Sequence, residues 1–190
     1  MKIVGLLLAA GSATRFGSDK LRHALPHGVP IAVQAARQLK AELDEVIVVV
    51  RDAGAKGAFD REGCRTVLCE NAAEGMGVSL ACAVRAAGRR QGYIVALGDM
   101  PFVRRTSIAA VRQALERGAA IVQPFFRARP GHPVGFAGKF HDQLVMLRGD
   151  EGARRVVAAH QTEVVKIPIG DPGVIRDIDT PDDLAPPIRV

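Results

Sequence analysis

Two aspartates stand at the ends of apolar runs in separate parts of the chain. Asp99 closes the stretch YIVALGD, and Asp179 closes VIRDID. A buried strand delivers its last side chains to the edge of a sheet, where ligands of α/β proteins bind. Mg²⁺ prefers one or two protein carboxylates together with water and substrate phosphates. We therefore predict that Asp99 and Asp179 are metal ligands, with Mg²⁺ as the expected ion and Mn²⁺ as the alternative.

Each aspartate also suits a purely structural role. Asp99 precedes Met-Pro and could form a turn, and Asp179 precedes Thr-Pro-Asp and could cap a helix. Both interpretations stay open at the level of the sequence.

The stretch IVGLLLAAGSATRFGSDK, residues 3–20, has the pattern of a buried strand that runs into a glycine-bounded loop. The loop residues that follow the strand have small side chains or none: Ala9, Ala10, Gly11 and Ser12. Backbone N–H groups can therefore approach an anion closely. Arg15 and Lys20 add positive charge. The loop is predicted to bind phosphate groups, the alternative being a polar turn with both cations solvated.

Neither of two common phosphate-binding patterns describes this loop. The dinucleotide pattern GxGxxG fails because Ala9 and Ser12 stand where close glycines are needed. The pattern GxxxxGK[ST] fails because five residues separate Gly11 from Gly17, and two more precede Lys20. The loop must therefore bind phosphate in a third way.

Composition limits the classes of protein and partner. With 190 residues and 48% hydrophobic content, the chain is expected to form a single domain over residues 1–190. The net charge of +6 favours small polyanions, whereas 4% aromatic residues without Trp argue against nucleic acid. No window approaches the ~20 apolar residues of a membrane span, and no signal segment leads the chain. We expect a soluble, cytoplasmic protein whose three scattered cysteines are ordinary thiols.

Strand and helix patterns alternate through the first two thirds of the chain. Strands are expected at 3–8, 46–50, 66–69, 93–97 and 120–124, and helices at 31–43, 78–87 and 106–117, the last with Thr106 as N-cap. The later part is less regular: 125–137 is rich in turns, 139–146 and 151–160 suggest short helices, 163–169 a strand, and 175–184 a short strand, a turn and a helical start.

This alternation predicts a three-layer α/β/α sandwich with a Rossmann-like, mostly parallel sheet. Ligands of such sheets bind at the carboxyl ends of the strands. The loop after residue 8, the loop 71–77 and the turn at Asp99 all follow expected strands. The stretch 70–84 also combines Asn71 and the flexible Gly75 with a helix that begins near Ser79, where a ligand could bind or Ser79 could simply cap the helix.

The first loop resembles the LAAGxSxRxGxxK signature of nucleotidyltransferases, in particular the molybdenum cofactor cytidylyltransferases. The match comprises Leu8, Ala9, Ala10, Gly11, Ser12, Arg15, Gly17 and Lys20. The resemblance implies a nucleotidyltransferase fold and transfer of CMP from CTP to the phosphate of molybdenum-bound molybdopterin, with release of pyrophosphate. It also implies that Leu8, Ala9, Ala10, Gly11, Arg15 and Lys20 bind the nucleotide, and that Lys20, Arg15 and Asp99 are catalytic.

Further motifs of this family follow in the expected order up to residue 184. The NxxxxGMxxSL stretch implies that Asn71, Gly75 and Ser79 lie beside the base, although Ala72-Ala73-Glu74 lacks the Trp that relatives often have. The metal motifs match residues 98–101 and 177–181. The GxPxxF and GDxGAR segments imply the acceptor-binding residues His132, Pro133, Gly149, Asp150 and Arg154. Gly149 and Asp150 could also open and cap a helix, the alternative for these acceptor segments being solvated loops. The N-terminal half would then bind the nucleotide and the C-terminal half the acceptor.

Two alternatives remain. Guanylyltransferases of the same fold typically carry a second glycine where Ala10 stands, so Ala9-Ala10 favours the pyrimidine, but GTP remains an alternative to CTP. The chain could also be a non-catalytic protein that holds the cofactor for an apo-molybdoenzyme of the xanthine dehydrogenase type. The presence of Lys20, Asp99 and Asp179 together favours the enzyme, because a carrier has no use for the complete set.

Overall fold

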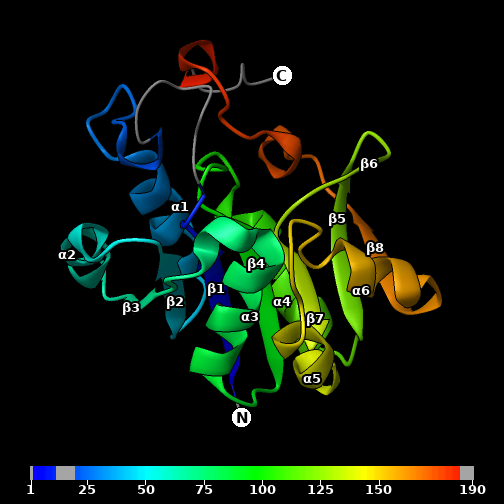
Figure 1. Cartoon of the computed structure of the whole chain (residues 1–190). Helices are drawn as coiled ribbons and strands as arrows, with labels where there is room; N and C mark the ends of the chain where they lie inside the picture. Colours follow the sequence, from blue (N-terminus) through cyan, green and yellow to red (C-terminus); the bar gives the residue numbers. More distant parts are fainter. Residues whose placement is uncertain (1, 12–19, 185–190) are drawn as a thin grey trace.

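The computed structural model describes residues 2–11 and 20–184. Its strands form one eight-stranded sheet in the order β3-β2-β1-β4-β7-β5-β6, with β8 also paired to β5 (Figure 1). The strands are β1 (Ile3–Leu8), β2 (Val46–Val50), β3 (Arg65–Leu68), β4 (Gly92–Leu97), β5 (Ile121–Phe126), β6 (Arg129–Pro130), β7 (Val134–Ala137) and β8 (Val164–Pro168). Strands β3, β2, β1 and β4 are parallel, as are β5 and β8, whereas β7 is antiparallel to both of its neighbours. The predicted α/β fold with a mostly parallel sheet is confirmed.

Helices cover both faces of this sheet. On one face lie α1 (Ile31–Lys40) and α4 (Arg105–Glu116), and on the other α3 (Met76–Ala87), α5 (His141–Val145) and α6 (Arg154–Ala159). The short helix α2 (Lys56–Asp60) contributes Phe59 to the core of the first face. Single 3₁₀ turns connect the elements at Lys20–Arg22, Ala53–Ala55, Ala72–Glu74, Gly138–Phe140, Gln161–Glu163, Pro172–Ile175 and Pro181–Leu184.

The central strands are uniformly apolar because both of their faces are buried. Every residue of β1 and β2 is buried. Successive side chains of a strand point to opposite faces, so Leu7 and Val48 join the core beneath α1 and α4, whereas Leu6 and Ile47 join the core beneath α3. None of the described helices is long and apolar enough to cross a membrane.

Two expected helix starts are wrong. Helix α4 begins at Arg105, so Thr106 lies inside the helix, and Arg104 precedes it. The buried carboxylate of Asp171 binds this end, accepting hydrogen bonds from the Arg104 backbone N–H (2.8 Å) and the Ser107 hydroxyl (2.7 Å). Helix α6 begins at Arg154, and so Gly149 and Asp150 do not open it.

Two segments near the second half of the sheet also differ from expectation. Residues 125–137, expected to be turns, contain the end of β5, a hairpin turn with positive φ at Arg127 (48°) and Ala128 (65°), and strands β6 and β7. Residues 175–179, expected to include a short strand, pair with no strand. Sequence alone did not indicate β7 because this four-residue strand is inserted between β4 and β5, a long-range arrangement.

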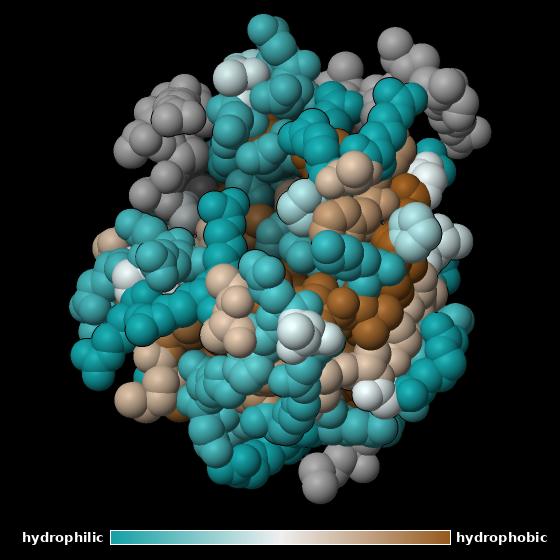
Figure 2. Space-filling view, turned by 90° about the vertical axis from the view of Figure 1, so that its right-hand side faces the viewer, coloured by the Kyte–Doolittle hydropathy of each residue, from teal (hydrophilic) through white to brown (hydrophobic). Residues whose placement is uncertain are grey.

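Strand β8 pairs with β5 at the end of the sheet opposite β3. Seen from that side, the surface shows apolar residues in the middle of the face and hydrophilic residues over most of the rest (Figure 2). Val165 of β8 is among the exposed large apolar residues. The cysteines are free thiols, with Cys64 and Cys69 buried and Cys82 half-buried.

Candidate active site

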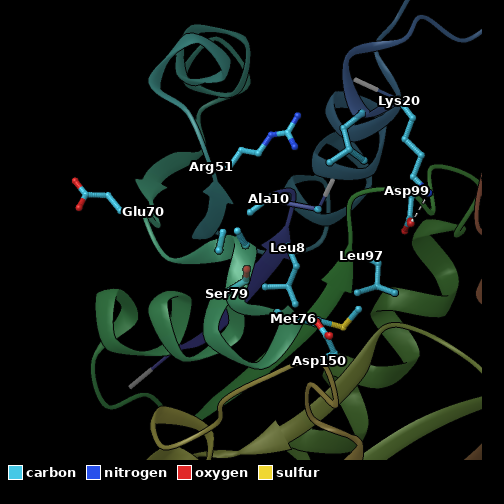
Figure 3. A pocket seen from close by; sticks show the side chains of 15 residues that line it. Leu8, Ala10, Lys20, Arg51, Glu70, Met76, Ser79, Leu97, Asp99 and Asp150 are labelled. Carbon is cyan, nitrogen blue, oxygen red and sulfur yellow. Dashed lines mark ion pairs between the residues drawn. The ribbon is translucent and has the colours of Figure 1, made fainter. Parts of the chain in front are cut away.

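A cavity of about 500 Å³ lies at the carboxyl ends of the parallel strands. Leu8, Ala10 and Gly11 enter it from the end of β1, and Arg51, Leu97 and Asp99 from the ends of β2 and β4. The loop after β3 and the start of α3 contribute Glu70, Ala72, Ala73, Gly75, Met76 and Ser79. In the view of Figure 3, Arg51 and the pair formed by Lys20 and Asp99 lie on either side of Ala10. The loops after β1, β3 and β4 therefore lie at the same edge of the sheet, as the sequence predicted.

A second cavity, of about 480 Å³, adjoins the first. It lies among the end of β4, the β5–β6 hairpin, β7 and α6. The two cavities share Leu8, Met76, Leu97 and Asp150 as lining residues. Two molecules that occupied these cavities would meet at this common wall.

Three carboxylates form a cluster that reaches both cavities. One oxygen from each of Asp99, Asp177 and Asp179 lies within 4.8 Å of the others. Asp99 lines the first cavity and Asp177 the second. The sequence interpretation missed Asp177 as a ligand, although its position two residues before Asp179 was a usable signal. In an extended segment such residues point the same way, while Ile178 between them is fully buried.

Hydrogen bonds hold the segment 177–179 in place. The backbone N–H of Ile178 donates to the carbonyl of Asp99 at 2.9 Å, which joins the two parts of the carboxylate cluster. The carboxylate of Asp183 accepts hydrogen bonds from the N–H of Asp179 (3.1 Å) and from the N–H and hydroxyl of Thr180 (both 2.9 Å). The backbone that carries Asp177 and Asp179 is thus held next to Asp99 by the protein itself.

The ammonium group of Lys20 lies 3.1 Å from Asp99 Oδ2 and 3.0 Å from Asp179 Oδ1. Burial raises the pKa of Asp99 even though Lys20 opposes the shift. Burial by itself would lower the pKa of Lys20, but Asp99 and Asp179 more than compensate, and this pKa is raised. Lys20 is therefore a cation between carboxylates. Oxygen ligands of this kind suit a hard divalent ion, and the ammonium acts as a stand-in for such an ion, so the residues fit a divalent metal.

The structure places most of the predicted nucleotide-binding residues in the first cavity. Its lining includes Leu8, Ala10, Gly11, Lys20, Gly75, Ser79 and Asp99. Ala9 is not part of it, and its N–H donates to the carbonyl of Val49 at 2.9 Å. Asn71 is exposed and lies outside the lining. Arg15, together with residues 12–19 as a whole, lies outside the described residues. The sequence interpretation missed Arg51, a basic residue directly after an apolar strand.

Some of the predicted acceptor-binding residues line the second cavity, and others lie next to it. His132, Asp150 and Arg154 line the second cavity, along with the unpredicted Gln123, Arg129 and Gln161. Pro133 is buried beside it. Gly149 does not line either cavity, but its carbonyl accepts a hydrogen bond from the N–H of Gly77 at 2.7 Å. Burial lowers the pKa of His132 to about 4, so its ring is neutral near pH 7 and its buried Nδ1 has no described partner.

A family model described as the MobA-like NTP transferase domain matches residues 5–164. The chain belongs to the MobA-like NTP transferase family. It is 30% identical over 194 residues to the purine catabolism protein PucB of Bacillus subtilis (strain 168), an alignment covering 95% of this chain and 93% of that protein. The recognition of this nucleotidyltransferase superfamily from the sequence motifs is confirmed.

Solved structures agree with the family. Rv0371c from Mycobacterium tuberculosis H37Rv superposes with a TM-score of 0.82 at 25% identity, covering 96% of this chain and 94% of that one. A second structure of Rv0371c, in complex with manganese, gives a TM-score of 0.76 at 25% identity and covers 96% of both chains. Molybdopterin-guanine dinucleotide biosynthesis protein A from Archaeoglobus fulgidus, at 20% identity, TM-score 0.66 and coverage of 95% and 94%, shows the shared fold.

Proposed function

We propose that this MobA-like transferase moves CMP from CTP to the phosphate of molybdenum-bound molybdopterin and releases pyrophosphate. The observation that carries the proposal is the position of the carboxylate cluster, with Asp99 on one cavity and Asp177 on the other. A group-transfer enzyme needs two substrate sites whose reacting groups meet beside a source of positive charge. In this proposal the nucleotide binds in the first cavity, mainly to the N-terminal half of the chain, and the acceptor binds in the second, mainly to the C-terminal half. Both halves belong to a single domain.

The nucleotide assignment rests on the walls of the first cavity. Ala10 and Gly11 bring backbone close to the phosphates, and Lys20 lines the same cavity as a cation. Arg15 is assigned to the phosphates from the sequence motif alone. Gly75 and Ser79, with Leu8, Ala9 and Asn71, are assigned to the nucleoside. Ala10 is only 5% exposed and lines the cavity. Its methyl group takes up space that a glycine would leave to a purine, which favours CTP over GTP.

The reaction requires little covalent chemistry from the protein. An oxygen of the acceptor phosphate attacks the α-phosphorus of CTP in line, the bond to the bridging α–β oxygen breaks, and pyrophosphate leaves with that electron pair. A phosphate nucleophile needs no proton removed, so no general base is assigned, and His132 contacts the acceptor as a neutral group. Lys20 and Arg15 neutralise the triphosphate, and Arg154 binds the acceptor phosphate. Asp150, Gly149 and Pro133 belong to the acceptor site as the residues that surround it.

A divalent cation held by Asp99, Asp177 and Asp179 would supply further positive charge for the phosphate oxygens. We propose Mg²⁺, with Mn²⁺ as the alternative that the manganese complex of Rv0371c supports. The recipient of the product would be an apo-molybdoenzyme of the xanthine dehydrogenase type. The name of PucB, a purine catabolism protein, agrees with a recipient that oxidises purines. A cytoplasmic location stays a prediction.

Thermal unfolding with each of CTP, GTP, ATP and UTP in the presence of Mg²⁺ tests the nucleotide, because a ligand of the native state raises the melting temperature. We expect stabilisation by CTP alone, followed by CTP-dependent pyrophosphate release when molybdenum-bound molybdopterin is added. Stabilisation by GTP alone would move the assignment to guanylyl transfer. If none of the four shifted the transition, the cofactor-delivery alternative would replace the enzyme.

A further inference from the structure

The ammonium group of Lys20 occupies the position of a cation within the carboxylate cluster. It lies 3.1 Å from Asp99 Oδ2 and 3.0 Å from Asp179 Oδ1 (Figure 3 shows the pair with Asp99). The Lys20 and Asp99 side chains are 13% and 25% exposed, so water screens this pair poorly, whereas the Asp179 side chain is 53% exposed and its pair with Lys20 is better screened. A divalent cation that bound the same two oxygens would have to displace the ammonium or share the site with a like charge.

The backbone that carries the cluster is held by hydrogen bonds that do not involve Lys20. The backbone N–H of Asp179 donates to the carboxylate of Asp183 at 3.1 Å, and the Asp99 carbonyl accepts the N–H of Ile178 at 2.9 Å. The backbone therefore keeps the three aspartates at the same place when the ammonium leaves, and their repelling carboxylates then favour another cation. Lysine also suits such a movement, because its charge is compact and sits on a flexible four-carbon stem.

A second anion in reach can draw the ammonium away. Lys20 lines the cavity assigned to the nucleotide, as do Ala10 and Gly11. A triphosphate there would offer Lys20 several charged oxygens in exchange for the two carboxylates that it leaves. The carboxylates would then be available to the divalent cation.

We propose that Lys20 is a substitute cation that blocks metal binding in the empty protein, and that a nucleoside triphosphate releases the carboxylates by attracting its ammonium group. This inference rests on the proposed function for the identity of the anion. Nucleotide and divalent cation then bind cooperatively: each increases the affinity of the other by the same factor. Metal without nucleotide binds weakly, which keeps the cluster free of adventitious ions.

The decisive experiment measures Mn²⁺ alone, without nucleotide, by the loss of the electron paramagnetic resonance signal of free Mn²⁺ on titration with protein. Lys20→Met should bind Mn²⁺ about tenfold or more tightly than the wild type, because a positive charge next to the site has been removed. Lys56→Met makes the same change of charge at an exposed lysine and should leave the affinity unchanged. Adding Asp99→Asn to Lys20→Met should abolish the gain.

Equal or weaker Mn²⁺ binding by Lys20→Met, with far-ultraviolet circular dichroism matching the wild type, would overturn the inference. Lys20→Arg keeps the charge and tests the same point should the methionine variant not fold. It should bind Mn²⁺ as weakly as the wild type, and a tenfold gain would show that charge is not the cause.

The coupling between nucleotide and metal is tested separately, by the increase in melting temperature that CTP causes with and without Mn²⁺. Mn²⁺ should add more to the stabilisation by CTP in the wild type than in Lys20→Met. An equal increase in both proteins would contradict the coupling. Failure of every nucleotide to bind the wild type would instead overturn the proposed function, while the result with Mn²⁺ alone would still decide the role of Lys20.

Discussion

The backbone N–H of Gly77 donates a hydrogen bond of 2.7 Å to the carbonyl of Gly149. Gly77 lies in the first turn of α3, beside the cavity assigned to the nucleotide, and Gly149 belongs to the loop that precedes α6 on the acceptor side. The backbones come this close because Gly77 has no side chain: a Cβ there would lie 2.7 Å from the carbonyl oxygen of Arg148. The two halves of the site are in direct contact at this point.

Gly77→Ala should therefore affect both substrates. The added methyl group must push the loop 148–150 away, and overpacking of this kind costs about 1–3 kcal/mol. We expect a lower melting temperature, weaker binding of CTP and a higher KM for the acceptor. Gly170→Ala is the matched control, because a Cβ there meets nothing within 4 Å. A variant of Gly77 with a normal KM for the acceptor would argue against coupling through this contact.

Asp177 is predicted to matter as much as the two aspartates that the sequence singled out. Asp177→Asn removes one negative charge from the cluster that faces the second cavity. Transfer of CMP should fall by about 10²-fold or more, as when one group that stabilises charge in a transition state is lost. Pyrophosphate release measures the effect. Asp182→Asn, in the same segment but outside the cluster, should retain activity, and equal loss in both variants would point to a general disturbance of the segment.

Asp171 should control the stability of the segment that carries the cluster. Its buried carboxylate accepts hydrogen bonds from the Arg104 N–H (2.8 Å), the Ser107 hydroxyl (2.7 Å) and the Gly173 N–H (2.9 Å). Asp171→Ala leaves these donors without an acceptor, which should lower the free energy of unfolding by about 3 kcal/mol. Urea denaturation measures the loss.

Asp171→Asn keeps one carbonyl oxygen as an acceptor and should lose less stability than Asp171→Ala. If the alanine variant unfolded at the same urea concentration as the wild type, Asp171 would have no such role.

Local patterns were sufficient for the central part of the fold. Strands β1 and β2 could be predicted because continuous apolar runs such as 46–50 are typical of strands buried on both faces. The start of α4 could not be predicted, because Asp171, which accepts hydrogen bonds from Arg104 and Ser107 there, lies far away in the sequence. Residues 125–137 were misassigned for a similar reason: the pairing of β7 with β4 and β5 is decided by long-range contacts, not by its four residues.

The candidate site shows the same division. Asp99 and Lys20 stood out because each follows a recognisable strand or glycine-rich loop. The ion pair between them could not be predicted, since it depends on how the chain returns to the edge of the sheet. Arg129 was missed as a lining residue because it reaches the second cavity from a hairpin that the sequence did not indicate. The predicted role of Arg15 stays a prediction, since that residue lies outside the described chain.

His132 should make stability depend on pH between about 6.5 and 4. Burial lowers the pKa of this side chain to about 4 in the folded protein, against about 6.5 when it is exposed. Between these values the unfolded chain binds a proton that the folded protein does not, so stability falls as the pH is lowered. The contribution is fully present above pH 6.5, and about 3 kcal/mol of it is lost by pH 4.

Carboxylates titrate in the same range, so the informative quantity is the difference between the wild type and His132→Asn, which has no ring to protonate. The free energy of unfolding, measured by urea denaturation from pH 7.5 to 4, should fall less steeply for His132→Asn than for the wild type. His27→Asn changes an exposed histidine and should follow the wild-type curve. Parallel curves for His132→Asn and the wild type would mean that the ring of His132 accepts a proton as readily in the folded protein as in the unfolded chain.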